Sequence, residues 1–211
     1  MPDLQQLFDA VLEGNAPAAK SGVQDALAAG MKPQYLLDEC LIPAMDEVGR
    51  RFEANEYFVP ELLIAARAMK GGLEILRPLL AESGGKRAGK VVIGTVRGDL
   101  HDIGKNLVGA MLEGGGFEVI DLGVDVSPEQ FATAVRDNGA ELVAISALLT
   151  TTMSGMKSVI ETLDKHGMRP GVRVMVGGAP VTQRFADEIG ADAFSDNASG
   201  AVRVARGLLA A

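Results

Sequence analysis

The sequence is poor in aromatic residues, with seven Phe, two Tyr and no Trp among 211 residues. A core must therefore be built mainly from Ala, Val, Leu, Ile and Met. The hydrophobic share of 47% is ordinary for a globular protein. The chain is long enough and apolar enough for one large or two small domains.

Clustered positive charge is also missing, since the formal net charge is −8 and no run of Lys or Arg occurs. Nucleic acids and anionic membranes are bound by clustered basic residues, so we expect neither as a partner. No apolar stretch reaches 18 residues, which predicts no membrane-spanning helix. The first residues have no basic segment followed by an apolar run, so we expect no signal peptide and a cytoplasmic protein.

Cysteine and histidine are scarce. The single cysteine, Cys40, excludes an internal disulfide framework and a cysteine-based zinc site. Its simplest interpretation is a small apolar residue on a helix. Only two histidines, His101 and His166, are present, so the position of each is informative.

Helical periodicity dominates residues 1–81. Apolar residues recur at three- and four-residue spacing, as in amphipathic helices. Gly30 favours the end of one helix and Pro33 the start of the next. We expect a four-helix bundle whose helices cover about 4–12, 16–29, 33–54 and 60–80. The Gly-rich, charged segment 82–89 is a predicted linker.

The second domain, residues 90–211, alternates short apolar runs with helical segments. Continuous apolar runs indicate parallel strands covered on both faces. Ser127, Pro128 and Gln130 together indicate a capped helix start. We predict a Rossmann- or flavodoxin-like domain with a five-stranded parallel sheet. The strand candidates are 90–96, 118–124, 141–148, 173–179 and 191–194.

Ligands of such folds bind beyond the carboxyl ends of the strands, and the loop after the first strand places His101 there, between Asp99 and Asp102. Asp99 could accept one ring N–H of His101 and raise the basicity of a metal-ligating imidazole. A solvated loop whose Asp99 or Asp102 caps the next helix is the alternative. A phosphate cradle is disfavoured because neither glycine-rich nucleotide motif is present.

Three elements follow one another in order: Asp99-x-His101-x-x-Gly104, then Ser146-x-Leu148, then Gly177-Gly178. This set resembles the signature of proteins that bind cobalamin base-off and histidine-on. The segment 52–62 and the helix after it resemble the helical cap of methyl-transferring corrinoid proteins. The whole chain is similar to the corrinoid proteins of methylamine, methanol and aryl-methyl-ether methyltransferase systems, and to the cobalamin module of methionine synthase.

The resemblance implies a role for each matching residue. His101 would be the lower axial ligand of cobalt, Asp99 would orient it, and Ser146 would extend the hydrogen-bond relay towards solvent. The deep slot that receives the cofactor's displaced nucleotide tail would be lined by Gly104, Leu148, Thr150, Gly177 and Gly178. Other cofactor contacts in the motif loop would come from Gly98, Asp102 and Ile103. The upper face, which carries the methyl group, would be covered by Phe52, Val59 and Leu62.

Local alternatives exist for two of these groups. Phe52, Val59 and Leu62 also suit the core of a helical bundle, and Gly177-Gly178 also suits a plain turn after a strand. The chemistry of the cofactor favours the binding roles instead, because a reactive cobalt-bound methyl group needs a dry apolar cover. The hydroxyls of Ser146 and Thr150 could satisfy polar atoms of a buried tail.

The implied activity is methyl transfer on cobalamin, which alternates between methylcobalamin and reduced Co(I) or Co(II) forms. The implied partners are a substrate-specific methyltransferase, an acceptor methyltransferase that uses a folate or a thiol, and a reductive activator. The main rival is a B12-dependent sensor, but the chain has no DNA-binding segment, no Trp, and Leu62 where a Glu-His pair would need His. A small mutase subunit is a second rival, yet such subunits have no helical bundle.

Overall fold

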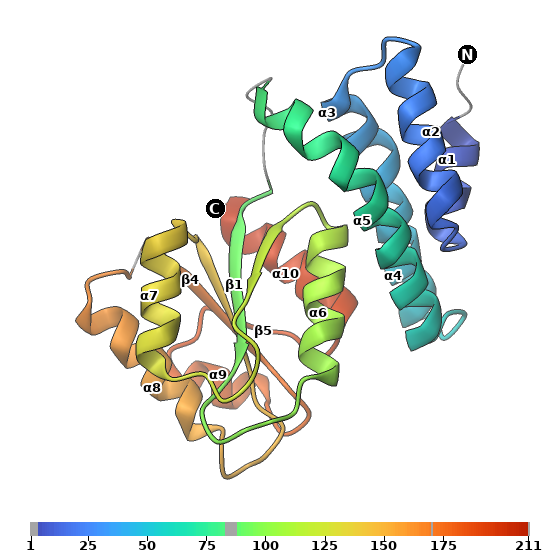
Figure 1. Ribbon diagram of the computed structural model, residues 1–211. Coiled ribbons are helices and arrows are strands. Elements are labelled where there is room, and N and C mark those ends of the chain that lie inside the picture. Colours follow the sequence, from blue (N-terminus) through green and yellow to red (C-terminus); the bar gives the residue numbers. More distant parts are fainter. Residues whose placement is uncertain (1–3, 83–87, 170, 211) are drawn as a thin grey trace. The chain divides into compact units, whose positions relative to one another are not determined.

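The computed structural model describes residues 4–82, 88–169 and 171–210. They form two compact units, a helical unit built from 4–82 together with 113–116 and a sheet unit built from 88–112 and 117–210 (Figure 1). The expected order of helical region and parallel sheet is confirmed. None of the helices in these described segments has the length and apolarity needed to cross a membrane. Most of the predicted linker, namely 83–87, lies outside the described residues.

The helical unit follows the apolar periodicity of its sequence. Asn15 accepts a hydrogen bond from the Ala18 amide and caps the second helix, which ends just before Gly30 with its φ of 84°. Buried apolar residues from every helix form the core. The elements are α1 (Leu4–Leu12), α2 (Ala16–Ala28), α3 (Pro33–Leu36), the π-helical turn η1 (Leu37–Leu41), α4 (Ile42–Glu53) and α5 (Val59–Glu82).

The third expected helix, over 33–54, is interrupted by the π-helical turn η1. Pro43 lies in the first turn of α4. Proline cannot donate a backbone hydrogen bond, and its ring would crowd the carbonyl four residues earlier. The amide of Ile42 donates instead to the Leu37 carbonyl five residues back, which is the π spacing. The wider turn therefore lets the helical run continue past a proline.

The sheet unit has the parallel strand order β2-β1-β3-β4-β5, which is the flavodoxin-like order. All five predicted strands are present, although each is shorter than expected. The Ser127 cap is confirmed, with a reciprocal hydrogen bond between Ser127 and Gln130. The strands are β1 (Lys90–Thr95), β2 (Glu118–Asp121), β3 (Leu142–Ser146), β4 (Arg173–Gly177) and β5 (Ala193–Phe194).

Helices α6 to α10 cover the sheet (Figure 1). Alternate residues of β1 point to opposite faces, and Val92 and Val96 join a continuous apolar core with residues of three helices, α7 (Pro128–Asn138), α8 (Ser154–Lys165) and α9 (Gln183–Ile189). Val91, Ile93 and Thr95 belong to the other face. The remaining helices of the unit are α6 (Ile103–Gly114) and α10 (Ala198–Ala210).

Candidate functional site

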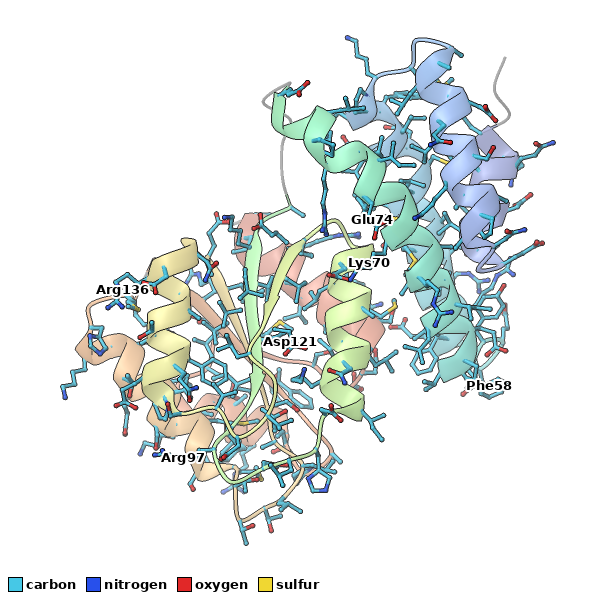
Figure 2. All side chains as sticks on the ribbon, in the orientation of Figure 1. Phe58, Lys70, Glu74, Arg97, Asp121 and Arg136 are labelled. Carbon is cyan, nitrogen blue, oxygen red and sulfur yellow. The ribbon has the colours of Figure 1, made fainter. Side chains whose placement is uncertain are left out.

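The candidate site lies where β1 and β3 end at the carboxyl edge of the sheet. These two strands are neighbours, yet β1 leads to β2 on one side and β3 leads to β4 on the other. Such a switch point is where ligands of open α/β sheets bind. The loop after β1 carries Arg97, labelled in Figure 2, followed by the Asp99 and His101 motif.

The carboxylate of Asp99 is the centre of the site and is fully buried. Its Oδ1 atom lies 2.7 Å from His101 Nδ1 and accepts the His101 amide at 3.1 Å. Its Oδ2 atom accepts the Leu148 amide at 2.8 Å and the Thr152 hydroxyl at 2.7 Å. Asp99 therefore joins the loop after β1 to the loop after β3.

Asp99 stays ionised in this environment. Burial alone would raise the pKa of its carboxyl, but the Leu148 amide, the Thr152 hydroxyl and His101 together outweigh burial and hold that pKa well below its usual range. An ionised carboxylate only accepts hydrogen bonds. We therefore assign the ring proton of His101 to Nδ1, which leaves a lone pair on Nε2 for a metal.

The side chain of His101 is half exposed, with 50% of its surface accessible. Four large apolar side chains on the same two loops and on the first turn of α6 are exposed as well: Leu100, Ile103, Leu148 and Leu149. Ile103 keeps 83% of its surface in contact with solvent. A half-exposed imidazole on loops that also expose large apolar side chains suits a large, mostly apolar ligand with a metal at its centre.

The glycines of the motif differ in what the protein itself requires of them. Gly178 has a φ of 133°, and a Cβ atom there would collide with the Ala147 carbonyl, so the fold needs this glycine. Gly104 is different, because a Cβ atom there would meet nothing within 4 Å. Glycine disfavours a helix, and Gly104 lies in the first turn of α6. The fold itself does not need a glycine at this position. The open space beside Gly104 is therefore consistent with a bound group that approaches the backbone closely.

The expected relay from Asp99 through Ser146 stays a prediction. Among the described residues the hydroxyl that donates to Asp99 belongs to Thr152. Ser146 stays in the sheet, paired with Thr95 and Gly177 in register. The chain then turns back after Leu149 and brings the Thr152 hydroxyl to the carboxylate.

Asp102 directly precedes α6, but neither of its contacts is a side-chain cap of a backbone amide, so the capping alternative stays a prediction. Its carbonyl accepts the Asn106 amide and its carboxylate accepts the Asn106 side chain. The Asp99 carboxylate bonds instead to His101, the Leu148 amide and the Thr152 hydroxyl. The contacts expected of Gly98, Ile103 and Thr150 with a cofactor remain predictions.

Two polar contacts at this edge were not anticipated from the sequence. Lys105 is almost fully buried, and its ammonium binds both carboxylate oxygens of Asp121 at the end of β2. Asp125 has a left-handed φ of 55°, accepts the Gly98 amide at 2.7 Å and donates its own amide to the Asp99 carbonyl. No pattern in the sequence distinguished Asp125 from its neighbours.

The three residues expected over the upper face of a cofactor differ in exposure. Leu62 has no exposed surface, so the bundle-core alternative holds for it. Phe52 is partly buried, and Val59 is 39% exposed. Phe58, labelled in Figure 2 beside the start of α5, is exposed too, and its amide is fixed by the Glu61 carboxylate at 2.9 Å.

Comparison with known proteins decides the family. A B12 binding domain matches residues 89–204, and a second B12 binding domain matches residues 3–77. The chain belongs to the B12-binding corrinoid protein family. A dimethylamine corrinoid protein of Methanosarcina barkeri is 44% identical to it over 98% of this chain and 97% of its own length.

Solved structures of corrinoid proteins share this architecture. A cobalamin-binding protein from Desulfitobacterium hafniense matches with a TM-score of 0.81 and 33% identity over 99% of both chains. The methanol:cobalamin methyltransferase complex of Methanosarcina barkeri contains a chain that matches with a TM-score of 0.85 and 32% identity, over 98% of this chain and 79% of that one. The D-x-H-x-x-G loop of this corrinoid protein thus lies within a B12 binding domain, as expected from its sequence.

Proposed function

We propose that this corrinoid protein holds cobalamin base-off, with His101 Nε2 as the lower axial ligand, and carries a methyl group between two methyltransferases. The observation that carries the proposal is the 2.7 Å contact between His101 Nδ1 and the ionised Asp99 carboxylate. It fixes the imidazole with Nε2 free. When bound, the corrinoid supplies a cobalt centre that accepts and releases the methyl group.

The protein's own residues would orient the ligand and modulate its basicity. A carboxylate on the far nitrogen raises the basicity of a metal-ligating imidazole and fixes its orientation. Asp99 is itself immobilised by an amide and a hydroxyl from the loop after β3, so the imidazole has a rigid support. We propose that Gly104, Ser146, Leu148, Thr150, Gly177 and Gly178 line the slot for the nucleotide tail.

The helical unit is proposed to cover the upper face of the cofactor through Phe52 and Val59. Apolar cover protects a reactive methyl group from water. We place the boundary between the two functional parts in the segment 82–89. The protein would act in the cytoplasm, without nucleic acid or membrane as a partner.

The proposed partners are a substrate-specific methyltransferase, an acceptor methyltransferase and a reductive activator. The names of the relatives, a dimethylamine corrinoid protein and a methanol:cobalamin methyltransferase complex, support a methylated amine or methanol as the source of the methyl group. The acceptor would be a folate or a thiol on the second enzyme.

Electron paramagnetic resonance of the Co(II) form tests the axial ligand directly. Protein produced with ¹⁵N-histidine should show superhyperfine coupling to one ¹⁵N nucleus. His101→Ala should lose this coupling, while His166→Ala, which removes the only other histidine, should keep it. Coupling to an unlabelled nitrogen of the cofactor's own base in the wild-type protein would refute histidine ligation.

Methyl transfer itself is tested with candidate partner enzymes. The methylated form should pass its methyl group to an acceptor enzyme, and the demethylated form should regain it from a methylamine- or methanol-specific methyltransferase. If protein with histidine-ligated cobalt accepted a methyl group from neither donor enzyme, the proposed substrates would be rejected. The proposal of cobalamin binding would be unaffected by that result.

A further inference from the structure

Thr95, the last residue of β1, holds His101 by its main chain. The Thr95 hydroxyl donates to the His101 carbonyl at 3.0 Å. Thr95 has no exposed surface, so water cannot replace this acceptor. On its other side, the His101 amide is held by Asp99 Oδ1 at 3.1 Å. The peptide groups on both sides of the His101 side chain are therefore anchored.

The Thr95 backbone is fixed in turn by the segment after β2. Its amide donates to the Gly123 carbonyl at 3.0 Å, and its carbonyl accepts the Val126 amide at 2.9 Å. The next residue, Val96, donates its amide to the Ser146 carbonyl. The hydroxyl that holds His101 thus belongs to a residue whose backbone is bonded to the segment after β2 and paired in register with β3, so the sheet holds it rather than the motif loop.

The identity of this residue is not explained by strand formation alone. Threonine and valine have nearly the same shape and both favour strands. Val91 and Ile93, which share the face of β1 with Thr95, are apolar and buried. A hydroxyl at the third position of this face costs free energy unless it is hydrogen-bonded, and its acceptor is the carbonyl of His101.

We propose that Thr95 is a positioning residue for the axial ligand, acting on His101 through its carbonyl. The inference builds on the proposed ligation of cobalt by His101. Asp99 sets the direction of the imidazole ring, whereas Thr95 sets the height of the His101 main chain above the end of the sheet. If the motif loop moved away, the buried Thr95 hydroxyl would lose its acceptor, the His101 carbonyl. The loop position that keeps this hydrogen bond is therefore favoured.

The test compares Thr95→Val, which removes the hydroxyl and keeps the shape, with Thr95→Ser, which keeps the hydroxyl. In the Co(II) protein, Thr95→Val should lower the ratio of histidine-on to histidine-off cobalt by about 3- to 10-fold, the range for one lost neutral hydrogen bond. Thr95→Ser should restore the ratio to that of the wild type. Thr162→Val is the matched control, because the Thr162 hydroxyl also donates to a backbone carbonyl, but on α8.

A second readout needs no cofactor. In the apo protein, hydrogen exchange at the His101 amide should be faster in Thr95→Val than in the wild type, and unchanged in Thr162→Val. If Thr95→Val does not fold, the pair Thr95→Ser and Thr95→Cys makes the same comparison, since a thiol is a weak donor. In that case Thr95→Cys should show the lower ratio.

The outcomes separate this inference from the proposed function. A wild-type protein without histidine coupling would overturn the proposed ligation itself. Histidine coupling in the wild type, with the same ratio and the same exchange rate in Thr95→Val, would overturn only the role of Thr95. A loss of thermal stability in Thr95→Val with an unchanged ratio would also overturn it, because that result describes a residue of the core alone.

Discussion

The two units of the chain differ in what they bury. The sheet unit buries four polar side chains, Thr95, Asp99, Lys105 and Ser199, whereas none of the described residues of the helical unit is a buried polar one. All four lie at or just beyond the carboxyl ends of the strands or in the first turn of the following helix. The helical unit buries apolar side chains, among them Cys40, whose thiol pKa is raised to about 11 by burial.

This difference separates packing from ligand binding. Buried polar groups add stability only when every one of them is hydrogen-bonded. In the sheet unit such hydrogen-bonded polar groups lie at one edge, where Asp99 and Thr95 hold His101, the candidate cobalt ligand. The helical unit has no such requirement, so its residues can be exchanged for other apolar residues of similar volume with smaller consequences.

The strongest test of the comparison removes the central carboxylate. Asp99→Ala should cost about 4 kcal/mol of unfolding free energy, because the Leu148 amide and the Thr152 hydroxyl lose their acceptor in a buried site. It should also abolish histidine coupling in the Co(II) spectrum. Urea denaturation and electron paramagnetic resonance measure the two effects. A loss of stability with normal histidine coupling would return Asp99 to a purely structural role.

A milder change at the same position isolates its charge. Asp99→Asn should keep the fold and weaken axial ligation by about 10- to 100-fold, as is typical when the partner of a metal-ligating histidine is altered. Cobalt spectra recorded across a pH series provide the measurement. Unchanged spectra would mean that the negative charge has no part in ligation.

A substitution in the helical unit should show the opposite pattern. Leu62→Ala removes a fully buried side chain and should cost about 3 kcal/mol of stability, with an unchanged cobalt spectrum. Val59→Ala, at an exposed position, should cost little stability but speed photolysis of the bound methyl group. Faster photolysis in Leu62→Ala alone would assign the cover to Leu62 after all.

Gly104 offers a case in which stability and binding should move in opposite directions. Gly104→Ala should raise stability by about 0.5–1 kcal/mol, because alanine favours a helix and the site has room for a methyl group. The same change should weaken cobalamin binding, measured by spectroscopic titration. Gly109→Ala, on the same helix, is the control and should bind cobalamin normally. Unaltered binding by Gly104→Ala would remove Gly104 from the cofactor slot.

The smallest effect belongs to the surface of the helical unit. Arg50 and Arg51 lower the pKa of Glu47 from 4.5 to about 2. A lowered folded-state pKa adds stability above the unfolded pKa, and that stability is lost as the pH falls from about 4.5 towards 2. Glu47→Gln should therefore cost about 0.5–1 kcal/mol at pH 7 and much less near pH 2, where half of the folded-state carboxyl groups are protonated. Thermal melts at both values should show it, and an equal cost at both would exclude a charge effect.

The sequence predicts the architecture well because its signals are local. The periodicity of the helices, the apolar runs of the strands and the cap at Ser127 each depend on neighbouring residues, and all three were confirmed. The motif loop was likewise found at the end of β1. Its contact between Asp99 and His101 spans only two residues, so spacing alone indicates it.

Contacts between segments far apart in the sequence could not be predicted from it. Thr152 donates to Asp99 because the chain turns back after Leu149, and no local pattern in the sequence indicates that turn. The pairing of Lys105 with Asp121 depends on where α6 meets β2. The burial of Leu62 could not be separated from a role in covering the cofactor, since both require an apolar side chain at the same position.

The π-helical turn η1 determines which face of α4 points into the core. Each residue of a helix advances by about 100°, and a π turn holds one residue more than an α turn does. A deletion of one residue within Leu37–Leu41 would therefore restore α spacing with α4 in the same phase, whereas α spacing over all five residues would rotate α4 by that angle. In that second case the apolar face of α4 would turn away from the core. Met45 and Val48, now fully or almost fully buried, would leave the core. The π spacing of this short turn is therefore what keeps the apolar face of α4 in the core while the chain carries one extra residue.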